Sequence, residues 1–316
     1  MKKGGSMKKI FNPKTSFILS MAIFGTIGLF VSYIPLSSGE IALYRAVLAF
    51  LFVGIILLIT KQKINFKEIK KELIILLISG MAMGMNWVFL FQSYKYVSVS
   101  ISTLTYYFAP IIVTILCPII FKEKMTLKQI ICFIFSTVGL ILIISQGSSA
   151  EGNKNYLLGI IYGLSAAMLY AIVILLNKFI KTVEGLKRTF IQFFSSIIVL
   201  VPYVLMSGGL GKLESQKGLI ALLIVGLIHT GVTYCLYFSS LKELKGQEAA
   251  ILSYIDPLVA VVVSVVILKE VIYPLQIVGG ILIIGFNILN EIQIKKINKT
   301  NSEYLKIEKV DNNEID

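Results

Sequence analysis

The sequence predicts an all-α integral membrane protein with ten transmembrane helices in two inverted five-helix repeats. Composition is the first indication: 56% of the 316 residues are hydrophobic and 15% are charged, whereas soluble domains have roughly 45–50% apolar and about 25% charged residues. A soluble fold of this length would lack the charges to cover its surface. Apolar runs of the length that crosses a bilayer, about 20 residues, recur along the whole chain. An internal repeat, described below, supplies the arrangement.

Ten apolar runs account for the ten helices, and the connections between them are too short to hold a soluble domain. Two runs contain a single charge each, Arg45 in the second and Asp256 in the ninth. The first run is too long for a removed signal peptide and lacks a small-residue cleavage site. The runs are residues 15–39, 41–60, 73–94, 96–121, 129–150, 155–177, 189–211, 218–241, 249–268 and 271–290.

The placement of Lys and Arg predicts the orientation of these helices. With the N-terminus inside, all but six of the 30 Lys and Arg residues fall in cytoplasmic segments, as the positive-inside rule requires. We therefore expect a multi-pass protein of the cell membrane with both termini in the cytoplasm, a basic tail over residues 1–14 and a polar tail over residues 292–316. The net charge of +13 then reflects topology and does not indicate nucleic-acid binding.

A shift of 147 positions overlays the second half of the chain on the first. Tyr107 then aligns with Tyr254, Pro110 with Pro257 and Gly84 with Gly231, and these belong to a set of at least nine identities at this one shift. We expect two related units, residues 15–150 and 155–291. Each unit contains five spans, an odd number, so the two units enter the membrane in opposite directions. Inverted repeats are the architecture of many secondary transporters.

Three segments resemble the EamA-type permeases of the drug/metabolite transporter superfamily. They are EIALYRAVLAFLF in the second span and the paired stretches YYFAPIIVTILCPIIFKEKMTLKQ and YIDPLVAVVVSVVILKEVIYPLQIVGG. The resemblance extends from Phe17 to Asn290. It implies a ten-helix carrier of amino acids, other metabolites, sugars, nucleotide sugars or drugs, with a central cavity lined by both repeats. Among these, amino acids or related amphipathic compounds are the favoured substrates.

Asp256 is the sharpest candidate for a transport residue. An ionisable side chain in the middle of a span is costly and indicates function by default. Its carboxylate suits either proton coupling or binding of a substrate amine. The structural alternative is that Asp256 and Pro257 form the N-cap and first residue of a broken half-helix.

Other polar and aromatic residues in mid-span are candidates for substrate binding. His229, the only histidine, shares a helix face with Thr233 and suits either a proton relay or an interhelical hydrogen bond. Rings and amides at equivalent depths in both repeats suit an amphipathic metabolite, although packing alone explains any one of them. The remaining candidates are Asn86, Trp87, Tyr107, Tyr170 and Tyr254.

Prolines and charges near the ends of spans predict kinks and gates. Pro110 and Pro257 each remove a backbone hydrogen bond, and such broken helices mark the binding site of many carriers. For Arg45 we predict a gating pair with Glu40, the alternative being a side chain that snorkels to the outer interface. Gate or interface contacts are also predicted for Glu123 and Glu270.

The sequence predicts no enzyme, no cofactor and no metal site. No GxxxxGK[ST] motif is present for direct use of ATP, and a single histidine without metal-spaced partners argues against a membrane-embedded enzyme. The expected partners are a small-molecule substrate and the lipid bilayer. Solute flux would separate this interpretation from an enzyme or a receptor. Two GxxxG patterns, Gly80–Gly84 and Gly159–Gly163, fit close packing either within the bundle or in a homodimer.

Overall fold

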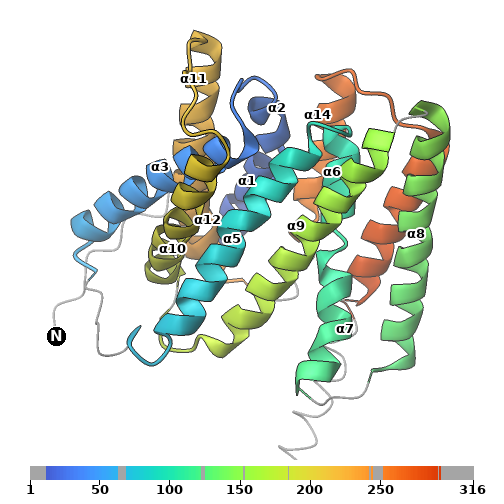
Figure 1. Cartoon of the computed structure of the whole chain (residues 1–316). Coiled ribbons are helices and arrows are strands. Elements are labelled where there is room, and N and C mark those ends of the chain that lie inside the picture. Colours follow the sequence, from blue (N-terminus) through green and yellow to red (C-terminus); the bar gives the residue numbers. More distant parts are fainter. Residues whose placement is uncertain are drawn as a thin grey trace, which may run out of the picture.

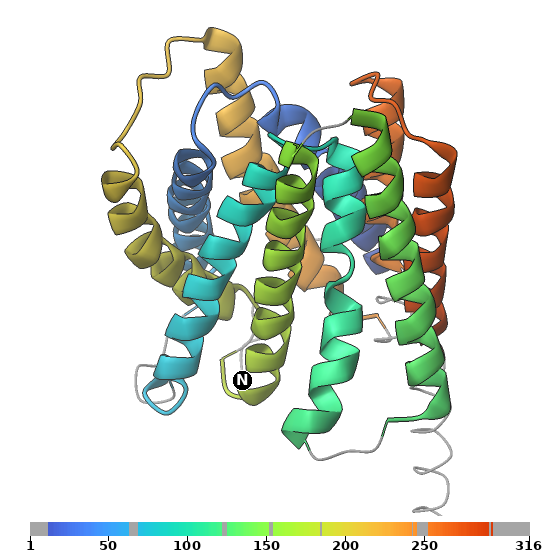
Figure 2. The same cartoon turned by 45° about the vertical axis from the view of Figure 1, so that its right-hand side comes forward.

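The structure, a computed structural model, describes residues 12–62, 69–121, 125–151, 154–183, 185–241, 243–244, 252–290 and 292. Every regular element in this part of the chain is a helix, and the helices stand side by side in one bundle (Figures 1 and 2). They are α1 (Pro13–Gly25), α2 (Ile27–Val31), α3 (Ser38–Ile59), α5 (Leu73–Ser93), α6 (Val99–Tyr106), α7 (Ala109–Phe121), α8 (Leu127–Glu151), α9 (Lys154–Phe179), α10 (Gly185–Met206), α11 (Gln216–Leu223), the π-helical η1 (Ile224–Val232), α12 (Thr233–Leu241), α14 (Ile255–Val266) and a last helix, Pro274–Asn290.

Eight helical segments of the described residues are long and apolar enough to cross a membrane. The first combines α1 and α2, the fourth combines α6 with much of α7, and the eighth runs through α11, η1 and α12. The other two apolar helices, α14 and Pro274–Asn290, are shorter. At a rise of 1.5 Å per residue, the 12 residues of α14 cover about 18 Å of a hydrocarbon core of about 30 Å.

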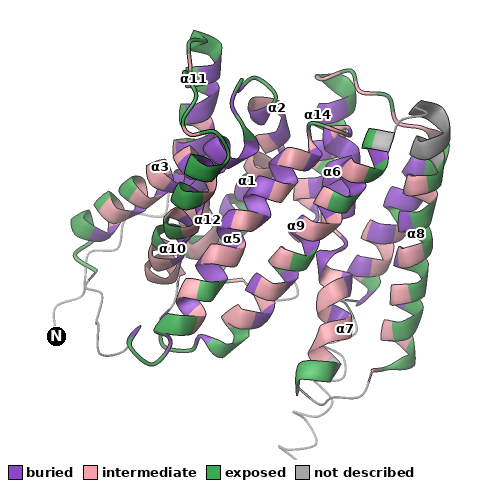
Figure 3. Cartoon of the chain, viewed as in Figure 1, coloured by how far each residue is buried: buried purple, intermediate pink, exposed green. Residues whose placement is uncertain are grey.

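The outside of the bundle is rich in large apolar side chains. Leu58 is 79% exposed, Ile74 72% and Met206 88%, and exposed positions follow the outward sides of helices such as α3 and α8 (Figure 3). Water would oppose such a surface, whereas lipid tails accept it. Together with the eight long apolar helices, this surface makes the chain a multi-pass membrane protein.

The segment between α2 and α3 corrects one predicted boundary. The sequence predicts a single helix over residues 15–39, but α2 ends at Val31 and α3 begins at Ser38. The Glu40 N–H donates to Ser37 Oγ at 3.2 Å, and the Ser37 N–H donates to Glu40 Oε2 at 2.8 Å. This capping box starts a new helix at the point where the hydropathy pattern shows no break.

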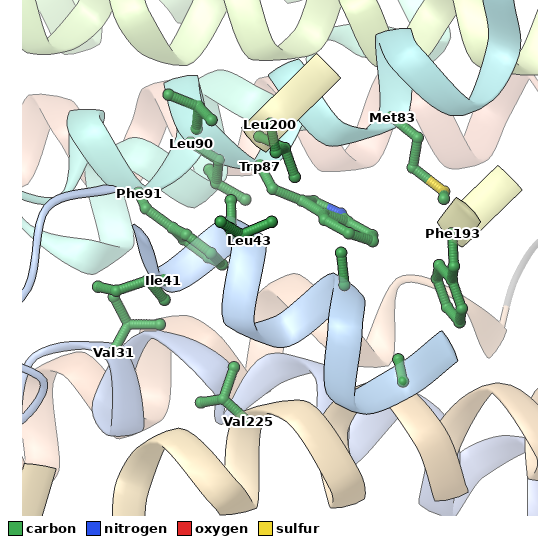
Figure 4. Packing of buried hydrophobic residues seen from close by; sticks show 14 of the residues in the cluster. Val31, Ile41, Leu43, Met83, Trp87, Leu90, Phe91, Phe193, Leu200 and Val225 are labelled. Atoms are coloured by element: carbon green, nitrogen blue, oxygen red, sulfur yellow. The ribbon is translucent and has the colours of Figure 1, made fainter. Parts of the chain in front are cut away.

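The two halves of the chain interlock. From the first half, α3 packs against α10 and η1, α5 packs against α9 and α10, and α1 packs against α12 and α14. Their main contact is an apolar core that joins Trp87 and Phe91 of α5 to Leu43 of α3, Phe193 of α10 and Val225 of η1 (Figure 4). Consequently, side chains from both halves meet in the middle of the bundle.

Both GxxxG pairs are used for packing inside the chain. A Cβ at Gly80 would lie 2.5 Å from the Gln192 carbonyl oxygen of α10, and one at Gly84 would lie 3.0 Å from Ser196 Cβ. Gly159 approaches Val97 in the same way. These glycines therefore bring helices of one protomer together and lend no support to the predicted homodimer, which stays a prediction.

Candidate functional site

Tyrosine side chains from several helices surround Asp256 in the interior. Asp256 lies in the first turn of α14, and Tyr107, directly after α6, donates a hydrogen bond from Oη to Asp256 Oδ2 at 2.7 Å. The ring of Tyr107 lies 6.2 Å from that of Tyr254. Further tyrosines of neighbouring helices lie in the vicinity of Asp256. We call the whole set the tyrosine cluster: Tyr94, Tyr106, Tyr107, Tyr170, Tyr234 and Tyr254.

Packing within the tyrosine cluster is incomplete. Tyr170 stacks on Tyr106 with ring centroids 5.2 Å apart and interacts with Tyr234 of another helix, yet it is 39% exposed. Asp256 and Tyr107 are also partly exposed despite their bond. Tyr107, Tyr170 and Asp256 therefore combine partners on other helices with surface that the protein itself does not cover.

Both predicted kink prolines lie in the first turn of a helix, after a point where the helical structure is interrupted. Pro110 is the second residue of α7, and Pro257 is the third residue of α14. Between α6 and α7 the Tyr107 carbonyl accepts a hydrogen bond from Asn287 Nδ2 at 3.0 Å. The predicted single helix over residues 96–121 is thus two helices, and the break carries Tyr107 into the cluster.

The structure does not support the predicted capping role of Asp256. The N-cap of α14 is Tyr254, which makes no side-chain capping bond, and Asp256 is the second residue of the helix. The Asp256 carboxylate accepts its hydrogen bond from Tyr107, a residue of the other half of the chain. This acid therefore joins the two halves.

Arg45 points inward and has partners other than those predicted. Its side chain is only 4% exposed, Nε donates to Thr230 Oγ1 at 2.7 Å, and Cζ lies 4.2 Å above the Trp87 ring. The guanidinium therefore does not snorkel to the interface. Glu40, the predicted gating partner, instead accepts a hydrogen bond from the Gly211 N–H at 2.5 Å. The predicted pair is not formed in this structure because each residue is held by a different helix or loop.

His229 is buried against α1. Its Nε2 lies 2.9 Å from Thr26 Oγ1 and its Nδ1 lies 3.3 Å from the Ile224 carbonyl oxygen. The Thr26 hydroxyl also lies 2.8 Å from the Ile23 carbonyl oxygen. A neutral ring with hydrogen on Nδ1 satisfies both of its contacts only when this hydroxyl donates to Nε2 in place of the Ile23 carbonyl. Thr233 donates to the Ile228 carbonyl at 2.7 Å within its own helix. The histidine thus makes the interhelical contact that the sequence offered as one alternative, and the structure does not bond it to Thr233.

The remaining predicted residues mostly join helices. Asn86 donates from Nδ2 to the Ala166 carbonyl at 2.6 Å and so links α5 to α9, while Trp87 lies in the apolar core (Figure 4). Glu270 accepts the Val99 N–H at 3.0 and 3.1 Å and the Ser264 hydroxyl. The Glu270 carboxylate therefore satisfies a backbone N–H in the first turn of α6 that has no acceptor within the helix. Glu123 lies outside the described residues.

Several residues of the site were missed in the sequence. Tyr234 was identifiable, because the shift of 147 aligns it with Trp87. Tyr94 and Tyr106 have no such signal, since the same shift pairs them with Leu241 and Ser253. Thr230 can be identified as a residue of the site only from the structure, where it accepts a hydrogen bond from Arg45. No group of three or more His, Cys, Asp or Glu side chains with metal-binding geometry occurs among the described residues.

Glu72 forms a second polar junction, at the end of the bundle where α5 begins. Its carboxylate accepts hydrogen bonds from the Lys181 N–H at 2.8 Å, the Thr182 N–H at 3.1 Å and the Thr182 hydroxyl at 2.6 Å. Burial acts to raise the pKa of Glu72, but these donors outweigh it, so the pKa lies below its ordinary value. The carboxylate therefore fastens the start of α5 to the segment between α9 and α10.

Comparisons with known proteins agree with this arrangement. The model of the EamA-like transporter family matches residues 15–145 and 157–290. The "Uncharacterized transporter YxxF" of Bacillus subtilis (strain 168) is 34% identical over 249 residues, 79% of each chain. An "Uncharacterized transporter" of Archaeoglobus fulgidus is 25% identical over 273 residues, 86% of this chain and 93% of the relative. A solved crystal structure is similar with a TM-score of 0.60 at 12% identity, covering 87% of this chain and 95% of the other, a likeness of fold alone.

Proposed function

This chain belongs to the EamA-like transporter family, and we propose that it is a secondary transporter that moves small organic metabolites across the cell membrane by alternating access. We also propose that its ten apolar helices form two inverted five-helix repeats, residues 15–150 and 155–291, with both termini in the cytoplasm. The family model matches each half of the chain once, and five apolar helices per half reverse the direction of the second half.

The observation that carries the proposal is the composition of the tyrosine cluster. Its members come from both halves: Tyr106 and Tyr107 follow one another at the end of α6, whereas Tyr170 and Tyr234 belong to α9 and α12. Asp256 of the second half is bonded to Tyr107 of the first. A site shared by two repeats opens to one side or the other when the repeats rock against each other.

The chemistry of the cluster favours an amphipathic solute. Tyrosine rings offer apolar faces for stacking, and their hydroxyls offer hydrogen bonds without fixed charge. Asp256 adds one carboxylate that attracts an ammonium group or carries a proton. We therefore propose amino acids or related amine-containing metabolites as the substrate class.

The test is solute efflux from proteoliposomes. Vesicles that contain the purified protein are loaded with a mixture of metabolites, and external solutes are identified by mass spectrometry with and without a pH gradient. We expect one class of compound to leave with unchanged mass, and Asp256→Asn to reduce its flux at least tenfold.

Glu214→Gln is the matched control, since Glu214 is an exposed acid in the segment after α10. It should transport like the parent. If parent vesicles release no compound faster than empty vesicles, the transporter proposal fails. If Asp256→Asn transports as well as the parent under both gradients, the protein remains a carrier but Asp256 has neither proposed role.

A further inference from the structure

Arg45 is an interior cation without a described anionic partner. Among the described residues, its only hydrogen bond runs from Nε to Thr230 Oγ1, and its two terminal nitrogens donate to none. Removing a charge from water without a partner costs several kcal/mol, and an arginine at membrane depth is expensive for the same reason. An anion that meets these terminal nitrogens would offset this cost.

Neighbouring helices hold the guanidinium in one orientation. The Thr230 hydroxyl that receives Nε itself donates to the Val225 carbonyl at 2.9 Å, inside the π-helical η1. Trp87 covers one face of the guanidinium at 4.2 Å, and Phe91 lies 5.7 Å away. With Nε and one face occupied, the terminal nitrogens remain, and these match the two oxygens of a carboxylate.

Arg45 borders the same cluster as Asp256. Tyr94, Tyr106 and Tyr234 interact electrostatically with Arg45, and the same three interact with Asp256. The two charges form no ion pair with each other in the structure, since Asp256 is bonded to Tyr107 and Arg45 to Thr230. The same three tyrosines therefore lie in the neighbourhood of both a carboxylate and a guanidinium, which have separate hydrogen-bond partners.

We propose that Arg45 binds a carboxylate of the transported solute through its terminal nitrogens, and that Thr230 is a positioning residue for this guanidinium. The inference rests on the proposed transport function and narrows it to solutes that carry a carboxylate. A solute that also carries an amine then has Asp256 within the same cluster as its second partner.

The chain contains its own reporter for this site. Trp87 is the only tryptophan, and it lies directly beneath Arg45. Fluorescence of the purified protein in nanodiscs can therefore be followed while amino acids are added. Each amino acid is compared with its C-terminal amide, which lacks the carboxylate, and with the corresponding acid that lacks the amine.

We expect one or more amino acids to change the Trp87 emission, and their amides to bind at least tenfold more weakly. Arg45→Gln should weaken binding of the acid more than tenfold and leave binding of the amide unchanged. Thr230→Val removes the hydroxyl at nearly constant volume and should weaken acid binding about threefold to tenfold. Because Thr230→Val preserves the buried charge, it keeps the test decisive if Arg45→Gln fails to fold.

Arg188→Gln is the matched control. Arg188 lies at the start of α10, where its side chain donates to the carbonyls of Val183 and Ile180, so its loss should leave solute binding unchanged. Equal binding of acid and amide, or parental binding by both Arg45→Gln and Thr230→Val, overturns the inference. A parent that responds to no carboxylate also overturns it, and flux from proteoliposomes then decides the transporter proposal independently.

Discussion

The contact between α5 and α10 predicts that one methyl group at Gly80 destabilises the whole bundle. A Cβ there would lie 2.5 Å from the Gln192 carbonyl oxygen and 2.6 Å from Ser195 Cβ, whereas ordinary contact begins at 3.4 Å. A carbonyl oxygen and a Cβ cannot rotate aside, so the two helices must separate by nearly 1 Å. Overpacking of this kind costs about 1–3 kcal/mol, and alanine regains about 0.5–1 kcal/mol of helix propensity over glycine.

We therefore expect Gly80→Ala to lower the free energy of unfolding by about 1 kcal/mol, the difference between the central values of these two contributions. The assay is thermal unfolding in detergent, followed with a thiol-reactive dye, because Cys132 is only 1% exposed and reacts when the bundle opens. At an unfolding entropy of about 2.1 cal/mol/K per residue, each kcal/mol corresponds to about 1.5 °C in the midpoint of a chain of 316 residues. The loss should therefore be readily measurable.

Gly285→Ala is the control for this experiment. It adds the same methyl group to the last helix, at a position where the added Cβ meets no side chain and no backbone of another helix within 4 Å. Only the propensity gain acts there, so its midpoint should equal or exceed that of the parent. If Gly80→Ala also unfolds at or above the parental temperature, α5 and α10 do not pack as closely as the structure has them, and the reasoning is refuted.

Three further predictions concern individual hydrogen bonds. The pKa of Glu72 is lowered in the folded protein, so the ionised Glu72 carboxylate stabilises the folded state. This contribution is fully present above the ordinary pKa of 4.5 and is lost as the pH falls through the lower pKa of the folded protein. The difference in midpoint between parent and Glu72→Gln should therefore narrow below about pH 4.5, and a constant difference would contradict this role. Glu270→Gln weakens the charged acceptor of the Val99 N–H and should cost about 1 kcal/mol. Faster hydrogen exchange in the first turn of α6 should accompany this loss, and unchanged exchange there would argue against the cap. Tyr107→Phe removes the donor to Asp256, an interaction worth about 1.5–3 kcal/mol, so solute flux should change at least tenfold while Tyr33→Phe, at an exposed tyrosine, leaves it unaltered.

Hydropathy located the helices but not all of their ends. A span is recognised from the sum of about 20 apolar side chains, so a helix lies in each predicted run. The end of α2 and the start of α3 depend instead on a local hydrogen-bond pattern. Ser37 followed by Glu40 has the spacing of a capping box, and this signal would have divided the run over residues 15–39.

The π-helical turn of η1 had no comparable signal. It lies where Gly226 and Gly231 let α3 approach, with Leu48 and Phe52 filling the space that larger side chains would need. Such a turn depends on the partner helix and not on local propensity. It also determines where His229 and Thr230 point, which explains why their partners were not predicted.

For the candidate site, depth in the membrane was predictable and direction around the helix was not. Tyr107, Tyr170, Tyr254 and Asp256 all reach the cluster, and the Asn86 side chain also interacts with Tyr106 of the cluster. His229, in contrast, turns to Thr26. The common feature of these candidates in the sequence is a position near the middle of a span, whereas a rotation of about 100° per residue determines which of them face the interior. The inward direction of Arg45 likewise depends on α5 and η1, which its own helix cannot reveal.

The two repeats contribute different residues to the hydrogen bond between the halves of the chain, and this difference matters for the proposed mechanism. The bond between Tyr107 and Asp256 joins the two halves, and the shift of 147 gives Tyr254 and Ala109 as its counterparts. Alanine has no carboxylate, so exchange of the repeats' conformations breaks this bond without forming an equivalent one. A ligand shifts such an equilibrium only by interacting differently with the two states. In the alternating-access mechanism that we propose, a solute amine or a proton that competes with Tyr107 for Asp256 would remove the bond that favours the present state. Such competition would supply the differential contact that alternating access requires.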